Sequence, residues 1–208
     1  MFEDKKRKGI GIDMKIAVLA VQGAFIEHEK MLEKLGAQVI ELRKTEDLIQ
    51  DFDGLVFPGG ESTVQGKLLQ ELSMYAPLKK KIEEGLPVLA TCAGLILLAE
   101  TISNDERRYF SVMPVLVKRN AYGRQLGSFF AEEEVRGIGK FPMEFIRAPY
   151  IESVGDGVEV LGTVDGNIVA VQYRNQIGVA FHPELTEHTG IHEKFLGLCS
   201  QHDLHYAK

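Results

Sequence analysis

Residues 86–100 are Leu-Pro-Val-Leu-Ala-Thr-Cys-Ala-Gly-Leu-Ile-Leu-Leu-Ala-Glu, and this stretch decides the fold. The run Val88–Thr91 is short, apolar and β-branched, which is typical of a buried strand in a parallel sheet. The residues Ala93–Glu100 have the composition of a helix that packs on such a sheet. Cys92 therefore falls at a sharp turn from strand to helix, with the small residue Gly94 close behind it.

Cys92 has the setting that a nucleophilic cysteine needs. A sharp turn between strand and helix brings the backbone close to its neighbours, which small flanking residues permit. The N-terminus of the following helix would stabilise a thiolate and offer backbone N–H donors to a developing oxyanion. A buried structural cysteine is the alternative, and these residues alone leave both interpretations open.

The chain before this stretch alternates strands with helices. Gly36 and Gly85 are natural C-terminal ends for two of the helices. The pattern predicts strands at 14–21, 37–42 and 54–57, and helices at 25–35, 45–51, after residue 62, and at 75–84. This alternation implies right-handed crossovers, and therefore an open, mostly parallel α/β sheet flanked by helices.

The C-terminal half has a different character, because turn signals such as Asp165-Gly166-Asn167 and Asn175 separate short strand-like segments. Such spacing is typical of antiparallel hairpins. The predicted strands are 112–118, 127–135, 144–148, 158–164, 168–173 and 176–181, and residues 190–202 are predicted as a terminal helix. The sequence thus predicts antiparallel strands added to the parallel sheet.

The composition fits one globular domain in a reducing compartment. With 208 residues, 45% of them hydrophobic, the chain is long enough to bury a full core, and we expect residues 14–208 to form a single domain. Residues 1–13 are charged and lack periodicity, so they are predicted to be a disordered leader, with Met14 as an alternative start. The two cysteines, Cys92 and Cys199, show neither metal nor disulfide spacing, which indicates the cytoplasm.

The charge and hydropathy exclude two classes of partner. A net charge of −6 argues against nucleic acid or an anionic membrane as the main partner. No apolar run approaches the roughly 20 residues that are needed to span a bilayer.

A histidine and a carboxylate near the end of the last strand could complete a catalytic triad. His182 ends an apolar strand, and Glu184 lies two residues further on, after a proline. Residues i and i+2 of an extended segment point to the same side, so this carboxylate can reach and orient the imidazole. A Cys–His pair completed by a carboxylate is a workable nucleophilic triad. A capping or core histidine is the alternative for His182.

Other histidines carry weaker signals. His188 and His192 have the i, i+4 spacing of metal ligands, but no third ligand has suitable spacing, so we predict no metal site. His28, on the first helix, is expected to be exposed.

The loop Pro58–Thr63, Pro-Gly-Gly-Glu-Ser-Thr, follows a predicted strand. Two glycines leave backbone N–H groups approachable, and Ser62 or Thr63 can cap the next helix. Ligands of open parallel sheets bind at the carboxyl ends of the strands, which is where this loop lies. A plain turn with a helix cap is the alternative.

Taken together, these motifs resemble the class I (triad) glutamine amidotransferases. Within that class the chain from Met14 onward closely resembles the family of glutaminase subunits of pyridoxal 5′-phosphate synthase. The matching segments are Ala20–Ala24, Pro58–Thr63, Thr91–Gly94, Arg119–Gln125, Ile146–Pro149 and Phe181–Thr186. One departure is visible, because Ala90 stands where the family's elbow usually has glycine.

The resemblance implies a flavodoxin-like class I fold and a glutaminase that releases ammonia from L-glutamine through Cys92, His182 and Glu184. It implies an oxyanion hole formed by backbone N–H groups of Gly59, Gly60 and Ala93. It further implies that glutamine contacts Gly60, Glu61, Ser62, Arg119, Ile146 and Arg147. For the arginines this is chemically sensible, since an α-carboxylate favours a guanidinium partner, although solvated surface charges are the alternative.

The same resemblance implies a partner that uses the ammonia. This partner would be the synthase subunit, a (β/α)8 barrel that makes pyridoxal 5′-phosphate, and the isolated glutaminase would be weakly active until the partner orders its oxyanion loop. We expect no cofactor on the chain itself, because no lysine motif for pyridoxal phosphate stands out and this compound would be the product. Candidate contact surfaces include the loop Gln22-Gly23-Ala24.

Two other functions remain open at this level. A cysteine peptidase or related hydrolase could use the same kind of elbow, and assays with glutamine and with peptides would separate them. A regulatory module could keep the fold without turnover, which labelling of the thiol by a glutamine-analogue electrophile would test.

Overall fold

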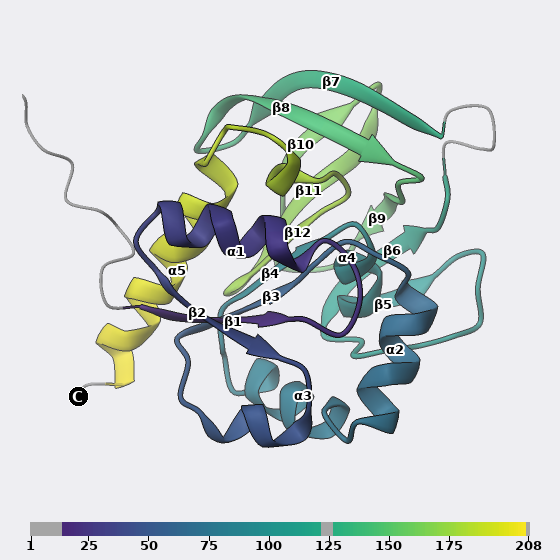
Figure 1. Cartoon of the computed structure of the whole chain (residues 1–208). Coiled ribbons are helices and arrows are strands. Elements are labelled where there is room, and N and C mark those ends of the chain that lie inside the picture. The colour runs from purple at the N-terminus through teal and green to yellow at the C-terminus, as the bar shows by residue number, and fades with distance from the viewer. Residues whose placement is uncertain (1–13, 122–126, 207–208) are drawn as a thin grey trace, which may run out of the picture.

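The computed structural model of the chain describes residues 14–121 and 127–206 (Figure 1). The leader predicted for residues 1–13 and residues 122–125 of the Arg119–Gln125 motif lie outside this range. No helix in the part of the chain that the structure describes combines the length and apolarity needed to cross a membrane.

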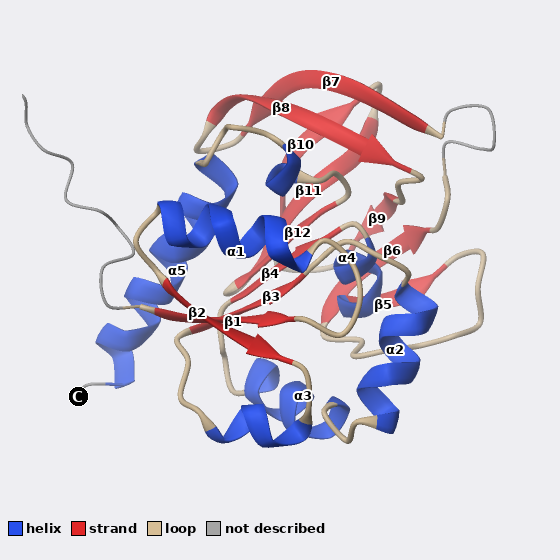
Figure 2. Ribbon diagram, in the orientation of Figure 1, coloured by secondary structure: helices blue, strands red, loops and turns tan. Residues whose placement is uncertain are grey.

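The first half of the chain alternates strands and helices, as its sequence predicts (Figure 2). Its elements are β1 (Lys15–Leu19), α1 (Phe25–Lys34), β2 (Gln38–Leu42), the 3-10 helix η1 (Thr45–Ile49), β3 (Gly54–Phe57), α2 (Ser62–Glu71), α3 (Tyr75–Glu83), β4 (Val88–Thr91) and α4 (Ala93–Leu98).

The second half is dominated by strands. Its elements are β5 (Ala99–Ile102), β6 (Met113–Lys118), β7 (Ser128–Val135), β8 (Gly139–Ile146), β9 (Tyr150–Val154), β10 (Val158–Val164), β11 (Asn167–Tyr173), β12 (Gln176–Val179), the 3-10 helix η2 (Pro183–Leu185) and α5 (Gly190–Tyr206).

The described strands form one large mixed sheet and a separate hairpin. The order in the large sheet is β2-β1-β3-β4-β12-β11-β9-β6-β5, with β10 paired to β11, and β7 pairs with β8. Pairing is parallel from β2 through β12, whereas β11 is antiparallel to β12, β9 and β10. The predicted fold class, a mostly parallel α/β sheet with antiparallel strands in the C-terminal half, is confirmed.

Helices cover both faces of the parallel part of the sheet (Figure 1). On one face α1 and α5 lie together, and on the other α2 contacts α4. The covering is close, because a Cβ added to Gly54 on β3 would lie 2.5 Å from the Sγ of Cys199 on α5. Every residue of β3, β4 and β12 is buried, as expected for central strands with helices on both faces.

Three predictions about the elements were wrong. The helix expected at 93–100 ends at Leu98, and the chain continues as β5. Strand β9 was not predicted, although it pairs with both β6 and β11. The strand expected at 144–148 is β8, which starts at Gly139 and stops before Arg147, whose φ of 44° breaks the extended conformation.

Candidate active site

Three loops meet at the carboxyl ends of neighbouring parallel strands. Strands β3, β4 and β12 are adjacent, and the chain leaves them at Pro58, Cys92 and Ala180. The parallel pairing places all three exits at one edge of the sheet. The predicted elbow, the glycine loop and the His-Pro-Glu segment are therefore brought together.

Cys92 sits at a strained turn between β4 and α4. Its φ and ψ are 47° and −99°, and its N–H donates to the carbonyl of Val179 at 2.8 Å. A positive φ in a residue with a side chain costs free energy, so the surrounding packing must hold it. Gly94 is part of that packing, because a Cβ there would lie only 2.2 Å from the carbonyl oxygen of Phe57.

The departure at Ala90 is accommodated in the sheet. Ala90 is fully buried on β4, and its paired residues are Phe57 on β3 and Gly178 on β12. The extra methyl group is therefore part of the packed core, in which the space beside Gly178 is filled by the side chains of Leu95 and Met113.

His182 and Glu184 form a buried pair beside the elbow. The Nδ1 of His182 lies 2.7 Å from the Oε1 of Glu184, and only 7% and 6% of these residues are exposed. The segment is a 3-10 turn with Pro183 at its start, rather than the extended chain from which the contact was predicted. The backbone N–H of His182 donates to the carbonyl of Glu144 on β8 at 2.8 Å, which fixes the turn to the hairpin.

The surroundings of His182 favour its charged form. Burial acts against the imidazolium, but hydrogen bonds to Cys92 and Glu184 outweigh burial and raise the pKa of His182 to about 10. A protonated imidazole next to a thiol is the arrangement that stabilises a thiolate.

The loop at Gly59 and Gly60 is pressed against the triad residues. A Cβ on Gly59 would lie 2.3 Å from the Cε1 of His182, and one on Gly60 would lie 2.5 Å from the Oε1 of Gln22. The loop is also held from the β1–α1 turn, because Ala24 N–H donates to the Gly59 carbonyl at 2.9 Å. Glycine is thus required here for close approach of the backbone.

A cavity of about 690 Å³ opens over these groups. It contains nine of the residues that the sequence singles out, while Gly59 and Glu184 lie behind its wall. Its lining is Gln22, Gly60, Glu61, Ser62, Cys92, Ala93, Ile96, Asn104, Arg119, Asn120, Gly127, Ile146, Arg147 and His182.

Arg119 is fixed at the cavity by two carboxylates. Its Nη1 lies 2.5 Å from the Oδ2 of Asp105 and its Nη2 lies 3.0 Å from the Oε1 of Glu61. Hydrogen bonds from Arg107, its backbone N–H included, and from Arg119 hold the pKa of Asp105 well below its usual range. Asn104 adds two hydrogen bonds of 3.0 Å to the backbone of Arg119. The side chain is therefore a positioned cation, with 15% of its surface exposed.

The model of the SNO glutamine amidotransferase family matches residues 18–201, which is most of the chain. The chain belongs to the SNO glutamine amidotransferase family. It is accordingly an enzyme of the glutamine amidotransferase class.

Individual relatives are similar to this chain in sequence and in structure. It is 65% identical over 183 residues, 88% of this chain and 92% of the relative, to "Pyridoxal 5′-phosphate synthase subunit PdxT" of Desulfitobacterium hafniense strain Y51. It is 51% identical over 191 residues, 90% and 99% of the two chains, to the protein of that name from Streptococcus pneumoniae strain ATCC 700669 / Spain 23F-1. A crystal structure of a glutamine amidotransferase superimposes with a TM-score of 0.84 at 42% identity, over 89% of this chain and 98% of that one.

One detail of the glycine loop differs from the sequence prediction. The helix after the glycine loop is capped by Glu61, whose side chain accepts the N–H of Thr63, and not by Ser62 or Thr63. Glu61 therefore serves both the cap and Arg119. Ser62 is buried at the cavity wall, and Ile146 and Arg147 are exposed at its rim.

His28 was expected to be exposed, and this was wrong. It is completely buried, with Nδ1 2.9 Å from the Nε2 of His192 and Nε2 3.2 Å from the Oγ1 of Thr91. The apolar spacing of α1 does not distinguish a buried polar face, since a histidine counts as polar in that pattern. Its partner on α5 lies 164 residues away along the chain.

Sequence reasoning also gave no role within the site to Gln22, Asn104 and Asp105. Gln22 lies in a motif that the resemblance used, and its Oε1 accepts the N–H of Glu61 at 2.8 Å. Asn104 and Asp105 follow β5, the strand that was not predicted, so their proximity to Arg119 had no signal in the sequence.

The histidines 188 and 192 do not face each other as ligands. His192 is buried against His28, while His188 Nδ1 accepts the N–H of Gly190. Among the side chains that the structure describes, those of residues 14–121 and 127–202, no group of three or more His, Cys, Asp or Glu is placed to hold a metal ion.

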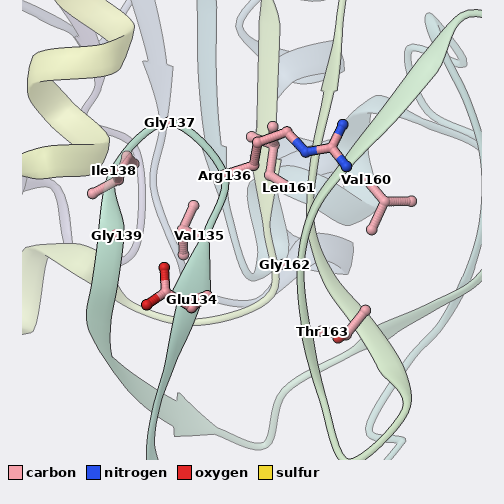
Figure 3. A pocket seen from close by; sticks show the side chains of 10 residues that line it. All are labelled: Glu134, Val135, Arg136, Gly137, Ile138, Gly139, Val160, Leu161, Gly162 and Thr163. Atoms are coloured by element: carbon pink, nitrogen blue, oxygen red, sulfur yellow. The ribbon is translucent and has the colours of Figure 1, made fainter.

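A second hollow lies where the β7–β8 turn meets β10 (Figure 3). Its volume is about 490 Å³, and its rim includes Arg136, whose N–H donates to the carbonyl of Leu161 at 2.8 Å. Its lining offers neither a thiol nor an imidazole, so the cavity at Cys92 is the candidate active site.

Proposed function

We propose that this chain is the glutaminase subunit of a pyridoxal 5′-phosphate synthase, and that it hydrolyses L-glutamine to L-glutamate and ammonia. The observation that carries the proposal is the arrangement of Cys92, His182 and Glu184 at one strand edge, under a cavity that also holds Arg119. The relatives in which most of this chain has a counterpart are named as subunits of that synthase.

Cys92 is the proposed nucleophile. Its sulfur attacks the side-chain amide carbon of glutamine, and the C–N bond breaks to leave a γ-glutamyl thioester. His182 gives its proton to the departing nitrogen, which leaves as ammonia, and then takes a proton from the water that attacks the thioester. The C–S bond breaks, glutamate is released, and the Cys92 sulfur is left as a thiolate beside the protonated imidazole. Glu184 accepts the Nδ1–H of His182 and so presents Nε2 to the reaction.

The oxyanion is proposed to bind backbone N–H groups of Gly59, Gly60 and Ala93. Ala93 begins α4, so its N–H belongs to a helix N-terminus, where the helix dipole also favours negative charge. Gly59 and Gly60 supply the close approach described above, because side chains at either position would collide with His182 or Gln22.

The glutamine itself is proposed to lie between the rim and the elbow. Arg119 binds its α-carboxylate and Glu61 its ammonium group, which pairs opposite charges. Gly60, Ser62, Ile146 and Arg147 complete the binding site on the cavity wall. Asp105 keeps Arg119 in place when the substrate draws the guanidinium away from Glu61.

The proposed partner is the barrel-type synthase subunit that accepts the ammonia in the cytoplasm. The Gln22-Gly23-Ala24 turn is a suitable contact, because it binds both Gly59 and Glu61 of the oxyanion loop. Gly23 has a φ of 106°, and a Cβ there would lie 1.9 Å from the Gly59 carbonyl oxygen. A partner bound to this turn would shift the Gly59–Gly60 loop, whose N–H groups are the proposed oxyanion donors. This would explain why the partner is expected to raise the rate of glutamine hydrolysis.

The deciding experiment is glutamine hydrolysis by the native chain and by Cys92→Ala, each with and without the synthase subunit. We expect the partner to raise the native rate sharply and the substitution to abolish it, with a loss of at least about 10³-fold by analogy with other nucleophile deletions. Cys199→Ala is the matched control, since Cys199 is also buried but lies on α5 and does not line the cavity.

Three other outcomes would change the proposal. Full activity in Cys92→Ala would overturn the triad. Cleavage of peptides in preference to glutamine would favour a cysteine peptidase. A native chain that stays silent with its partner, and whose Cys92 does not react with a glutamine-analogue electrophile, would favour a regulatory module.

A further inference from the structure

The second carboxylate oxygen of Glu184 faces into the protein. Oε1 of this residue binds His182, whereas Oε2 is buried and has no hydrogen bond within the described residues. A buried carboxylate oxygen without a donor is costly, because it has lost its water. The Nε2 of His28 lies 3.4 Å from this oxygen, and both side chains are completely buried.

His28 in turn belongs to a chain of side chains that crosses from α1 to α5. Its Nδ1 lies 2.9 Å from the Nε2 of His192, and its Nε2 lies 3.2 Å from the Oγ1 of Thr91, the residue before the nucleophile. Helix α1 also contacts η2, which carries Glu184 (Figure 1). The contacts therefore run in sequence from His182 through Glu184 and His28 to His192.

The hydrogen bonds favour one tautomer of His28. If Nε2 carries the proton, it can donate to Thr91 and Glu184, while Nδ1 accepts the Nε2–H of His192. The unpartnered Nδ1 of His192 is then an acceptor. In the other tautomer a lone pair of His28 faces the carboxylate, and His192 Nδ1–H becomes a buried donor without an acceptor among the described residues. The first arrangement leaves fewer groups unsatisfied.

From this geometry we infer that His28 is a positioning residue of the glutaminase reaction: its Nε2–H, which bonds Thr91, also faces Oε2 of Glu184 at 3.4 Å and stabilises that carboxylate, and His192 holds His28 in that tautomer. The inference rests on the proposed function for its kinetic consequence, but not for the hydrogen bonds. Glu184 is thereby held between two imidazoles, so that its other oxygen stays aligned with His182. The triad is extended by two histidines that never reach the substrate.

Both histidines are kept neutral in this position. Burial, together with the nearby His192 and His182, lowers the pKa of His28 well below its usual range, and burial lowers the pKa of His192 to about 3. A neutral His28 can turn its Nε2–H toward Glu184 without placing a second positive charge beside His182.

The tautomer can be measured without any activity. Nitrogen-15 NMR of the histidine side chains in the native chain distinguishes Nε2–H from Nδ1–H, and His28→Gln assigns the signals. We expect His28 as the neutral Nε2–H form. A neutral Nδ1–H form would overturn the inference.

The kinetic consequence is tested with three variants and the synthase subunit present. His28→Leu removes the donor, and we expect kcat to fall by about 10- to 100-fold, the range typical of a lost hydrogen bond to a catalytic ligand, with KM for glutamine unchanged. In His28→Gln the amide N–H lies near the position of Nε2–H, and we expect it to recover most of kcat. Leu32→Ala is the control for a loosened core, because Leu32 is fully buried one turn further along α1.

The outcomes separate the two proposals. Loss of kcat in His28→Leu with recovery in His28→Gln, while Leu32→Ala lowers only Tm, supports the positioning role. Native kcat in His28→Leu, or an equal loss in both His28 variants and Leu32→Ala, overturns it. A native chain without glutaminase activity would contradict the proposed function, and the NMR measurement would still decide the hydrogen bonds.

Discussion

Asp105 and Glu61 bind the same guanidinium in different surroundings. The Asp105 side chain is 11% exposed and also accepts hydrogen bonds from Arg107, whereas the Glu61 side chain is 52% exposed at the cavity mouth. An exposed ion pair exchanges its partner at little cost, while a buried and hydrogen-bonded one does not. Asp105 thus fixes Arg119, and Glu61 can give way to a substrate carboxylate.

Asp105→Asn should weaken glutamine binding. Loss of the charged anchor frees the Arg119 side chain, and we expect KM to rise about tenfold, the size of one hydrogen bond to a charged group, with kcat nearly unchanged. Steady-state kinetics checks this, with Asp156→Asn as control because Asp156 is an exposed acid in a loop. A fall in kcat at constant KM would contradict the assignment of Asp105 to binding.

At the level of single residues, the sequence predicts contacts between side chains that lie close together along the chain. Cys92 and the His182–Glu184 pair each lie within one short motif, so spacing alone indicates where they point. His28 and Asp105 could not be found in this way. Their contacts cross from α1 to α5 and from the β5–β6 connection to the rim, and such contacts arise only once the sheet has been assembled.

Helix α4 packs unusually close to β3, and Gly94 makes this possible. Gly94→Ala places a Cβ 2.2 Å from the Phe57 carbonyl oxygen, so the helix must move away from the sheet. We expect a loss of about 1–3 kcal/mol in the free energy of unfolding, as for other overpacked cores, and a fall in glutaminase activity because Cys92 moves with α4. Denaturant unfolding and kinetics of the same sample measure both.

Gly197→Ala is the matched control on α5. A Cβ at Gly197 meets nothing within 4 Å, and alanine is the better helix former, so the free energy of unfolding should rise by about 0.5–1 kcal/mol. Equal effects of the two substitutions would show that helix propensity, and not the contact with Phe57, decides the result at Gly94.

The bounds of a strand were predictable where an apolar run between turn residues was the dominant signal in the sequence. Strands β3, β4 and β10 have the predicted bounds because apolar runs between turn residues leave no other interpretation. Strand β5 was missed since the apolar run continues from α4 through Ala99 without a periodic signal. Pro142 hid the first half of β8, because proline argues against a strand, yet it is tolerated in a two-stranded hairpin.

The whole molecule should lose stability in acid through His28 and His192. Both imidazoles are neutral when folded and would each bind a proton when unfolded below pH 6.5, with the folded pKa of His192 at about 3. The unfolded chain then holds more protons, so stability falls as the pH falls from 6.5 towards 3, by up to about 1.4 kcal/mol per pH unit for each group.

Urea unfolding at a series of pH values tests this slope. His192→Leu removes one of the two groups, and its stability should depend less steeply on pH across that window than that of the native chain. Parallel curves for the two proteins would contradict the contribution of the buried histidines.

The stability of the folded chain at alkaline pH depends on His182. Its folded pKa of about 10 exceeds the ordinary value of 6.5, so the stabilisation is complete below pH 6.5 and disappears as the pH rises to 10. The loss is up to about 1.4 kcal/mol per pH unit for this group. His182→Asn should flatten the unfolding free energy between pH 7 and 10. An unchanged slope would show that His182 does not hold the extra proton.

The hydrogen bond from His182 N–H to the Glu144 carbonyl joins the turn that carries His182 and Glu184 to a hairpin that lies outside the main sheet. That amide can exchange with solvent deuterium only when the hairpin separates from the turn or the region unfolds. Its hydrogen–deuterium exchange rate therefore measures how often the hairpin separates from the turn. Slower exchange in the presence of the synthase subunit would show that the partner stiffens the chain at His182.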